Sequence, residues 1–576
     1  MPRLVVSVLR SLLPLVLALP ALATTWHVAP GGSPFATGTL ANPFATIQRG
    51  IDVSQAGDIV LVAPGTYLEN INFKGKAVIV RGAQGAAVTI IDGGLVDCCV
   101  LMVSGEGTAT KLDGFTLQNG KGLNAPANQM TLPFTQSNSR GGGIHMEFAS
   151  ARIERCVIRN CQGGRDTSTI SGQHASGGAM QILGGVPLVT DCVFEQNLGG
   201  LGASDPAVAG DGGPGAVFLR QSSAAFVNCI FRDNQGGGGG FGQSGGRGGA
   251  GGVSCYSIPC APGVSISPNA PAFVGCFFHD NTGGAGGPGD PTLGGDGGAG
   301  ALQALASAPV LYNETIVRNH GGMGDTVNFG ANGVGGVQSL DACAVVALTS
   351  CILRDNLGPT GSLSNRNGVV TLASCNSQGI QLANGNIDAD PKFRDAANDD
   401  FRLRADSPCI DAGLDAIAGI VPTDFEFEPR LIGRHVEIGA DEFCLAGSLE
   451  DLGMSIALNS GSPSPLCRRN VAVGDLVQAA ITSPGGTFAF APVYLLAQFW
   501  SPLAPLSQAG FPELHVNTAG FTILTQFGLP PGGAVPAGVA DASLTGTTLR
   551  LQAVAISPLA ANGFFASSPA FDLVIN

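Results

Sequence analysis

Two aspartates that recur at one position of a repeated phrase are the side chains best placed for catalysis. Asp233 and Asp280 lie in the phrases FRDN at 231–234 and FHDN at 278–281, and Asp355 holds the same place two copies later. Carboxyl groups on neighbouring turns of a fold can serve as the two carboxyl groups of glycoside hydrolysis. An Asp beside an Asn also caps turns. Asp233 and Asp280 are therefore candidates for a catalytic pair, with turn capping as the alternative.

A second set of polar side chains follows the glycine-rich phrase that opens each repeat. If each opening phrase is a strand, alternation places one row on its outer side. This first row contains His145, Gln181, Phe218, Ser254, Gln303 and Gln338, and the next row contains Arg220 and Tyr256. Amides both donate and accept, and a tyrosine ring is apolar, which suits a sugar chain. The predicted ligand-binding residues are His145, Gln181, Arg220, Tyr256, Gln303 and Gln338. Outward Gln side chains that pair only with each other are the alternative.

Other chemistries find less support in the sequence. A lyase that removes a proton beside a uronate carboxylate needs a base and a neutralising cation, and neither outward row holds such a cluster. Lys74, Lys76, Arg81 and Lys111 could form a basic patch, but their spacing does not require one. The GxSxG pattern at 242–246 lies in a glycine run, without the strand and helix that a nucleophile elbow needs. No Cys and His spacing is that of a zinc site.

These side chains belong to a sequence repeat that occurs six times between residues 140 and 359. Each copy opens on a phrase such as GGAMQI at 177–182 and closes on one such as CVFEQNLGG at 192–200. Equivalent positions are spaced by 36, 37, 47, 38 and 37 residues at Cys156, Cys192, Cys229, Cys276, Glu314 and Cys351. Such self-similarity predicts stacked copies of one unit, none of which buries its apolar face alone.

The unit is predicted to be a coil of short strands. Its apolar segments are rich in Val, Ile and Phe and are bounded by Gly, Asn and Asp, and none has helical spacing. Identical strands stack as parallel rungs about 4.8 Å apart. We therefore predict an all-β fold, a right-handed parallel β-helix of roughly ten coils from about Thr25 to residue 443.

Three rows of like residues should stack along this coil. An amide ladder, at a place where Asn also tolerates a left-handed turn, is predicted for Asn119, Asn197, Asn234, Asn281, Asn319 and Asn356, with Cys161 as a break. Phe194, Phe231 and Phe278 should stack inside. The five equivalent cysteines should serve as small buried apolar residues.

Glycine-rich segments separate the closing and opening phrases. They lie at 163–176, 199–213, 236–249, 283–298 and 321–333. Because they recur at one corner, they should project as a row of loops along one side of the coil. Their composition predicts that they form no core. A binding face and a row of tolerated spacers are both open interpretations.

Composition and the first residues suggest where the protein acts. A net charge of −14 argues against nucleic acid and anionic membranes as partners. Residues 1–23 are predicted to be a secretory signal, with Arg3 and Arg10 before an apolar run and Ala21-Leu22-Ala23 at its end. The run is too short to span a bilayer, so we expect a protein that is secreted or at the cell surface and not membrane-spanning.

The cysteine count agrees with export to an oxidising compartment. The chain has 15 cysteines, so at least one is unpaired. Cys255 and Cys260 could close a loop, and Cys444 and Cys467 could staple a domain boundary.

The opening of the chain carries a family resemblance. Its motifs are His27-Val28, Gly38-Thr39, Asn42-Pro43, Ala45-Thr46-Ile47, Gly57-Asp58 and Pro64-Gly65-Thr66-Tyr67. They resemble the N-terminus of secreted pectin-lyase-like β-helix proteins, and with the repeats the resemblance covers roughly residues 26–443. It implies the fold but no single activity, since that superfamily includes lyases, glycoside hydrolases and non-enzymes. FEQN at 194–197 and GGAM at 177–180 also resemble motifs of chlamydial polymorphic membrane proteins, which are adhesive.

The domain order predicted from these features is simple. The β-helix with its glycine-rich loops occupies 24–384, its last coils and cap 385–443, and a small antiparallel β-sandwich-like domain 445–576. A short helix at Thr46–Ser54 should cover the open first coil. Calcium could be bound by Asp390, Asp411, Asp424, Asp441 and Glu442, and no other cofactor is predicted. Alternatively, these acids satisfy turn backbones and pair with Arg402, Arg404 or Arg430.

Two functions remain open on this reading. The first is an exported, non-catalytic β-helix protein that binds polysaccharide or a cell-surface component. The second is a polysaccharide lyase or glycoside hydrolase of the pectin-lyase-like superfamily, using early-coil basic residues or Asp233 and Asp280. We favour the first because the outward rows lack a catalytic set.

Overall fold

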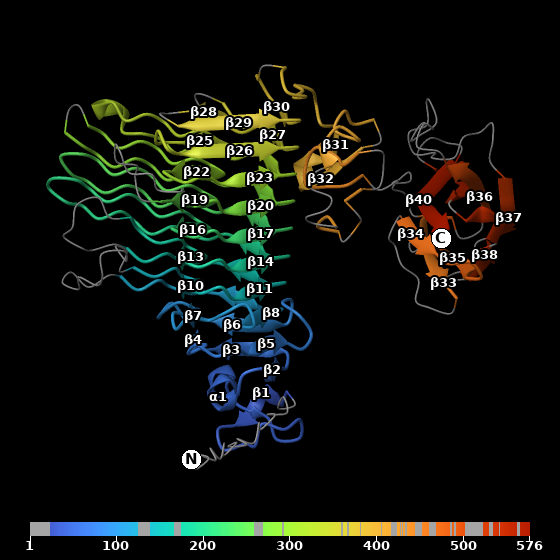
Figure 1. The fold of residues 1–576 in the computed structure, drawn as a ribbon, viewed down its shortest axis with the longest axis horizontal. Coiled ribbons are helices and arrows are strands. Elements are labelled where there is room, and N and C mark those ends of the chain that lie inside the picture. Colours follow the sequence, from blue (N-terminus) through green and yellow to red (C-terminus); the bar gives the residue numbers. More distant parts are fainter. Residues whose placement is uncertain are drawn as a thin grey trace, which may run out of the picture.

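Three long parallel sheets wind together into one right-handed β-helix in the computed structural model (Figure 1). The described residues are 23–124, 139–165, 174–257, 269–290, 293–358 and, with gaps, 361–500 and 522–575. Each coil passes through sheet 1, then sheet 2, then sheet 3. This is the fold class that the repeats predicted.

Each sheet takes one strand from each coil. Sheet 1 contains β1 (Thr25–Ser33), β2 (Ile59–Val62), β5 (Ile79–Gly82), β8 (Lys111–Asp113), β11 (Arg152–Glu154), β14 (Leu188–Thr190), β17 (Ala225–Val227), β20 (Ala272–Val274), β23 (Val310–Tyr312), β26 (Val345–Thr349) and β29 (Val369–Ala373). Sheet 2 contains β3 (Gly65–Leu68), β6 (Thr89–Asp92), β9 (Thr116–Gln118), β12 (Val157–Arg159), β15 (Val193–Glu195), β18 (Ile230–Arg232), β21 (Phe277–His279), β24 (Thr315–Val317), β27 (Ile352–Arg354) and β30 (Asn376–Ser377). Sheet 3 contains β4 (Ile71–Asn72), β7 (Val100–Met102), β10 (Ile144–Glu147), β13 (Met180–Leu183), β16 (Val217–Arg220), β19 (Val253–Tyr256), β22 (Leu302–Leu305), β25 (Val337–Ser339) and β28 (Leu363–Asn365).

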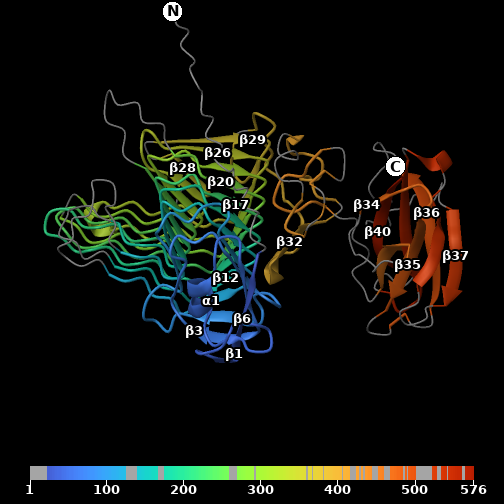
Figure 2. The ribbon, with the colours of Figure 1, turned by 60° about the horizontal axis from the view of Figure 1, so that its bottom comes forward.

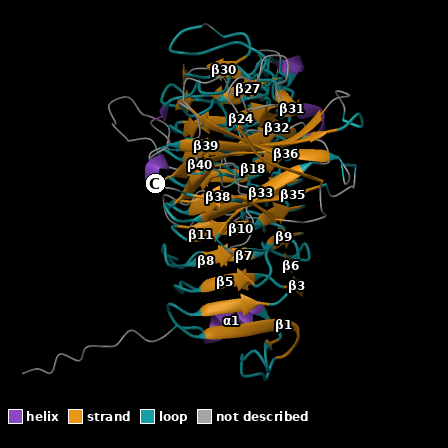
Figure 3. Ribbon diagram, turned by 90° about the vertical axis from the view of Figure 1, so that its right-hand side faces the viewer, coloured by secondary structure: helices purple, strands orange, loops and turns teal. Residues whose placement is uncertain are grey.

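The strands of successive coils stack one above another (Figure 3). They pair in register, so equivalent residues of the repeats, such as Phe194, Phe231 and Phe278, lie one above another. Phe194, Phe231 and Phe278 form the predicted interior stack, with ring centroids 4.8 and 4.5 Å apart and nearly parallel planes. Phe226 and Phe273 of sheet 1 form a second stack, 5.1 Å apart, that was not predicted. The recurring cysteines are free and buried, as expected. These rows fill the core of the coil.

The asparagine ladder is present, with one difference in alignment. The side-chain nitrogens of Asn197, Asn234, Asn281 and Asn319 each donate to the side-chain oxygen of the next Asn at 2.9 to 3.0 Å, ending at Asn356. Cys161 starts the row, and its backbone N–H donates to Asn197 at 3.0 Å. Asn119 is not a member, because sheet 2 pairing aligns it with Asn160.

The left-handed turn falls on the residue before each ladder Asn. Positive φ angles between 51° and 56° occur at Asn119, Asn160, Gln196, Asp233, Asp280, Arg318 and Asp355. Asp and Asn tolerate this conformation because a short polar side chain can bond locally. The turn and the ladder are therefore separate positions, not one.

The glycine-rich segments form a packed layer, contrary to the prediction that they build no core. They extend from the corner between sheets 2 and 3, beside β10 to β28 (Figure 1). Gly213 N donates to Gly200 O of its own loop, and Gly237 N of the next loop donates to Gly213 O, both at 2.8 Å. Every third residue of this loop, namely Gly199, Gly202 and Asp205, donates its N–H group to a backbone carbonyl of the next loop. Three residues per turn is the period of an extended polyproline II helix.

Close packing explains why this layer consists of glycine. A Cβ at Gly237 would lie 2.0 Å from Gly200 O, and one at Gly284 would lie 2.0 Å from Gly237 O. The described glycines of these loops have no positive φ, so backbone freedom is not the reason. We call this structure the glycine layer.

Helix α1 (Ile47–Val53) closes the first coil, as predicted. The Thr46 hydroxyl accepts from Arg49 N at 3.2 Å, which caps the N-terminus. Ile47 and Ile51 are buried against the core of the coil. Lys76 Nζ donates to the carbonyls of Ile51, Asp52 and Ser54 at the other end.

The coil ends earlier than residue 443. Its last rung includes β30, followed by a bridge from Asn376 to Ile387. The described residues of 393–443, here called the lateral segment, then run along the outer face of sheet 2, where β31 (Phe393–Asp395), η2 (Ala396–Asn398) and β32 (Asp400–Leu403) lie beside the rungs (Figure 1). Phe401, Leu403 and Ile438 pack on Phe277 and Ile352. The segment is therefore a side covering and not an end cap.

The C-terminal residues form two small sheets (Figure 2). One contains β33 (Gly453–Leu458), β35 (Leu476–Thr482) and β38 (Ala534–Val539), all antiparallel. The other contains β34 (Arg468–Val471), β36 (Pro492–Trp500), β37 (Thr522–Gly528), β39 (Thr548–Ile556) and β40 (Phe565–Ile575), with one parallel pair between β34 and β40. Short 3-10 turns η1 (Thr326–Asn328) and η4 (Ala542–Leu544) complete the described elements.

The structure tests some of the other sequence predictions, and some of them lie outside the described residues. Cys255 is free and buried, so a bridge to Cys260 is wrong, whereas Cys343 is disulfide-bonded. Cys444, Cys467 and most of the predicted signal lie outside the described residues. No helix in the described part is long and apolar enough to cross a membrane.

Replacing one ladder residue should lower stability. We expect Asn234→Leu to reduce the free energy of unfolding by roughly 1–3 kcal/mol, since Asn197 and Asn281 lose a buried partner. Chemical unfolding measures this, with the exposed neighbour Gln235→Leu as control. Equal stability of the Asn234 variant and the parent would show that apolar stacking alone holds the coil.

The glycine layer makes a matched prediction at two adjacent glycines. Gly237→Ala should destabilise the protein by about 1–3 kcal/mol, the usual range for overpacking, because its Cβ meets backbone at 2.0 Å. Gly238→Ala should be nearly neutral, since its nearest atom is 3.6 Å away. Equal melting temperatures of the two variants would contradict the close packing.

Candidate functional site

The predicted first row of ligand-binding residues points out of the coil but does not reach solvent. His145, Gln181, Ser254, Gln303 and Gln338 are each 8% exposed or less. Backbone near the strands already uses some of them, since Ala299 N donates to Gln303 at 3.4 Å. A buried row cannot hold a sugar chain, so an open binding row at these positions is wrong. The row is buried because the glycine layer packs beside sheet 3.

Tyr256, from the predicted second row, does line a hollow. The hollow measures about 370 Å³ and lies between the outer side of sheet 3 and the returning halves of the glycine-rich loops. We call it the groove. Its sheet side includes Tyr256 and Leu305, and its loop side includes His174, Asp211 and Arg247. Arg220 is the neighbour of Tyr256 on the adjacent strand, and its guanidinium carbon lies 5.1 Å from the centre of the Tyr256 ring.

Polar groups of the groove are held in place by one another. His174 Nδ1 lies 3.2 Å from Asp211 Oδ2, and Arg247 N donates to Asp211 Oδ1 at 2.7 Å. Burial would raise the pKa of Asp211, but the contacts with His174 and Arg247 outweigh it and lower that pKa. The Tyr256 ring lies 4.4 Å from the His174 ring. The groove thus offers a fixed aromatic ring beside a carboxylate and a guanidinium.

The loop side of the groove was missed by sequence reasoning. His174 and Asp211 pair as a parallel bridge, and Gly212 N donates to Arg247 O, which places Arg247 in the next loop beside Asp211. These residues lie in segments of different length and little alternation, so strand patterns could not align them. One sequence feature could have located them, namely a polar residue shortly before the final glycines of each glycine-rich segment.

A second hollow lies on the other side of the coil. It measures about 360 Å³ between sheet 2 and the lateral segment. Phe277, Phe401 and Phe425 make it apolar, while Arg232 and Arg402 lie among its charged residues. We call it the cleft.

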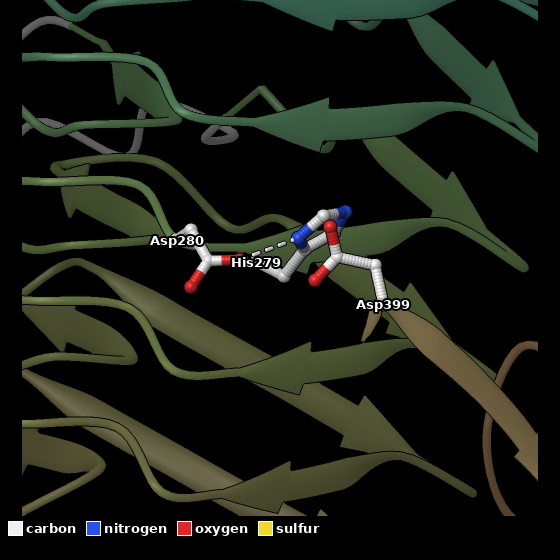
Figure 4. A group of neighbouring side chains, drawn as sticks. All are labelled: His279, Asp280 and Asp399. Atoms are coloured by element: carbon white, nitrogen blue, oxygen red, sulfur yellow. Dashed lines mark hydrogen bonds and ion pairs between the residues drawn. The ribbon is translucent and has the colours of Figure 1, made fainter. Parts of the chain in front are cut away.

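The two predicted catalytic aspartates lie near the cleft at equivalent places of successive coils. Asp280 accepts from His279 at 2.8 Å (Figure 4), and it also accepts from Arg318. Burial would raise the pKa of Asp280, yet these bonds lower it, whereas partial burial and the charge of Asp280 raise the pKa of Asp233. Both aspartates also occupy left-handed turns. The two aspartates thus differ in proton affinity, but Asp280 already forms an ion pair with Arg318.

His279, Asp280 and Asp399 bring their ligand atoms within 4.8 Å of one another (Figure 4). They are the one such group among the described residues. The Arg318 guanidinium contacts both carboxylates, so a positive charge already lies between them. This donor set does not fit a metal ion.

The acids predicted as calcium ligands have backbone partners. Asp390 accepts from Lys392 N, Asp411 from His435 N and Asp441 from Leu403 N, each at 2.9 Å. Asp424 accepts from three backbone N–H groups, including that of Glu442. Turn satisfaction, the alternative interpretation, accounts for these contacts, and calcium binding stays a prediction.

The early basic residues do not form an open patch. Lys74 pairs with Asp52 at 2.7 Å, Arg81 with Asp113 at 2.9 Å and Lys111 with Glu154 at 2.6 Å. Their charges are therefore used within the coil wall.

Comparison with known proteins adds little about activity. Residues 31–79 match the model of the family DUF1565, described as a protein of unknown function. No curated protein matches the chain.

Solved structures show three similarities. One is to pectate lyase Pel9A, at 13% identity and a TM-score of 0.36, over 73% of this chain and 97% of that one. Another is to a rhamnogalacturonan lyase, at 14% identity and a TM-score of 0.28, over 65% and 91%. A third is to XylC in a complex with xylose, at 10% identity and a TM-score of 0.27, over 89% and 100%. Likenesses of this size say nothing about activity.

Proposed function

We propose that this protein is an exported polysaccharide-binding β-helix and that the groove is its binding site. The observation that supports this most is the fixed cluster of Tyr256, His174, Asp211 and Arg247 in an open hollow. A ring provides an apolar face, and the charged groups beside it provide donors and acceptors for hydroxyl groups.

The shape of the groove also suits an extended ligand. Its loop side takes residues from four successive loops, from His174 through Asp211 and Arg247 to Asp296. Rungs about 4.8 Å apart make this side about 14 Å long. A short stretch of a linear polysaccharide fits such a length, and the mixed charges favour hydroxyl-rich over strongly anionic polymers. Binding and not bond cleavage is the role we assign to the groove.

A binding screen tests the proposal. The mature protein should be retained by at least one member of a panel of immobilised neutral and acidic polysaccharides. Tyr256→Ala should weaken that binding about tenfold, which corresponds to loss of about 1.4 kcal/mol, the upper range for an aromatic contact. Tyr256→Phe should keep most of the affinity.

The control lies outside the groove. Phe148 is 61% exposed, and Phe148→Ala should bind like the parent. Retention of the Tyr256→Ala variant at full affinity would place the site elsewhere, and no retention by the parent would contradict the proposed function.

Hydrolysis at Asp233 and Asp280 is the second candidate function. The opposite pKa shifts of two carboxyl groups at equivalent positions favour it, since such splitting separates a proton donor from a carboxylate. The contacts of Asp280 with Arg318 weigh against it. The test is reducing-end release from the same polysaccharide panel, with absorbance at 235 nm to detect a lyase. Activity that Asp233→Asn abolishes would support it, and no release by the parent would contradict it.

A further inference from the structure

A row of hydrogen bonds attaches the lateral segment to the coil along the corner between sheets 1 and 2. Asn228 and Asn313, at the turn position of their coils, donate to the carbonyls of Asp424 and Glu437 at 2.9 and 2.8 Å. In the opposite direction, Gly439 N donates to Ser350 O at 2.8 Å. Gly275 occupies the same turn position, and a Cβ there would lie 1.9 Å from Arg430 Nη2. The Arg430 guanidinium therefore fills the place of a missing side chain.

Buried acids are concentrated at this contact. Six carboxyl side chains that are 6% exposed or less lie here, namely Glu314, Asp424, Glu428, Glu437, Asp441 and Glu442. Glu314 comes from the coil and the others from the segment. Arg430, 1% exposed, is the one guanidinium among the described residues of the segment with comparable burial. Arg430 Nη1 lies 3.5 Å from Glu442 Oε1. At this contact, buried carboxyl groups therefore greatly outnumber buried basic groups.

Two of these carboxyl groups have an oxygen without a hydrogen-bond partner. They are Oε1 of Glu314 and Oε2 of Glu437. The other oxygen of Glu314 accepts from Cys276 N at 3.1 Å. A buried carboxylate with an unsatisfied oxygen is strongly disfavoured, and such a group usually binds a proton instead. Among the described residues, no three of the six acids bring oxygens within 4.8 Å of one another. The six acids therefore form no three-ligand cation site of this kind, and protons can neutralise them.

The charges that face these acids come from both sides of the contact. Burial raises the pKa of Glu428 to about 9, helped by Asp424, Glu426 and Asp441 and opposed by Arg402. Burial likewise raises the pKa of Asp441. The charges of Asp424 and Glu426 add to this rise, and Arg402 opposes it.

Three further members, Asp424, Glu442 and Glu314, show the same direction. Burial raises the pKa values of Asp424 and Glu442, and Arg430 opposes it in both; Asp424 and Asp411 add to the rise for Glu442. From the coil, burial and then Cys276 raise the pKa of Glu314, against the charge of Arg430.

We propose that the lateral segment is a proton-controlled latch. It stays on sheet 2 while the buried acids of the contact carry protons, and it opens when those acids ionise. Opening separates the two walls of the cleft, because Phe277 and Arg232 belong to the coil and Phe401 and Phe425 to the segment. Access to the cleft is then set by pH.

The direction of the pH effect follows from the raised pKa values. An open segment has its carboxyl groups in water, with pKa values of about 4, so closing near neutral pH takes up protons. Closing is strongest in acid and weakens as pH rises toward about 9, the pKa of Glu428 in the closed state. Each proton taken up makes the open fraction rise about tenfold per pH unit in that window.

Hydrogen exchange of the full-length mature protein tests the latch. The amides of Gly439 and Ala440 bond to Ser350 O and Thr315 Oγ1 of the coil, so they report closure. Their protection factors, corrected for the intrinsic pH dependence of exchange, should fall at least tenfold per unit between pH 6 and pH 9. Amides of the interior rungs, such as Phe231, should show no such fall.

Two variants separate proton binding from simple loss of structure. Glu428→Gln imitates the protonated side chain and should reduce the pH slope while keeping protection at pH 6. Asp406→Asn, which changes an exposed carboxyl group of the same segment, should leave the slope unchanged. If Glu428→Gln does not fold, Asp441→Asn and the slope of the parent protein carry the test.

Three outcomes would overturn the latch. One is protection that does not change with pH, and another is protection that increases with pH. The third is protection at pH 9 that calcium chloride restores and a chelator removes, which would assign the acids to a cation. None of these outcomes affects binding in the groove, which lies on sheet 3.

Discussion

In-register stacking of identical rungs is the constraint on which the whole molecule depends. Every residue of a coil lies one strand spacing from its equivalent, so residue types that pack well against copies of themselves are favoured in the core. Flat phenylalanine rings, small thiols and self-complementary amides meet that demand. Glu314 departs from this pattern because it takes the cysteine position in one coil, and its burial contributes to the acidic contact with the lateral segment.

The same constraint extends outside the coil in the glycine layer. There the backbone itself is the repeating group, and hydrogen bonds run both within a loop and between loops. Because neighbouring backbones approach within the space of a Cβ, glycine is required by contact and not by flexibility. The layer buries the outer row of sheet 3 and leaves the groove at its edge. A segment that resembles a spacer by composition therefore decides which side chains can meet a ligand.

Sequence reasoning predicted what depends on the repeat and missed what depends on contacts between unrelated segments. The coil, the Phe194 stack and the Asn234 ladder follow from period alone. The burial of Gln181 could not be predicted, because composition gave no sign that glycine-rich loops pack. The side position of the lateral segment depends on single contacts such as Arg430 at Gly275, which no pattern repeats. Of the predicted site residues, Tyr256 alone lines the groove, and the Arg220 guanidinium lies beside its ring.

The three-residue period of the glycine layer has a consequence for how the gene can change. Loss or gain of one codon in the bonded part of a loop turns the following backbone by about a third of a helical turn. N–H groups that pointed at a neighbouring loop would then point elsewhere, and positions next to a backbone would exchange with positions next to solvent. Gains and losses of three codons restore the phase. Natural length variation should therefore collect at the loop tips or come in steps of three residues.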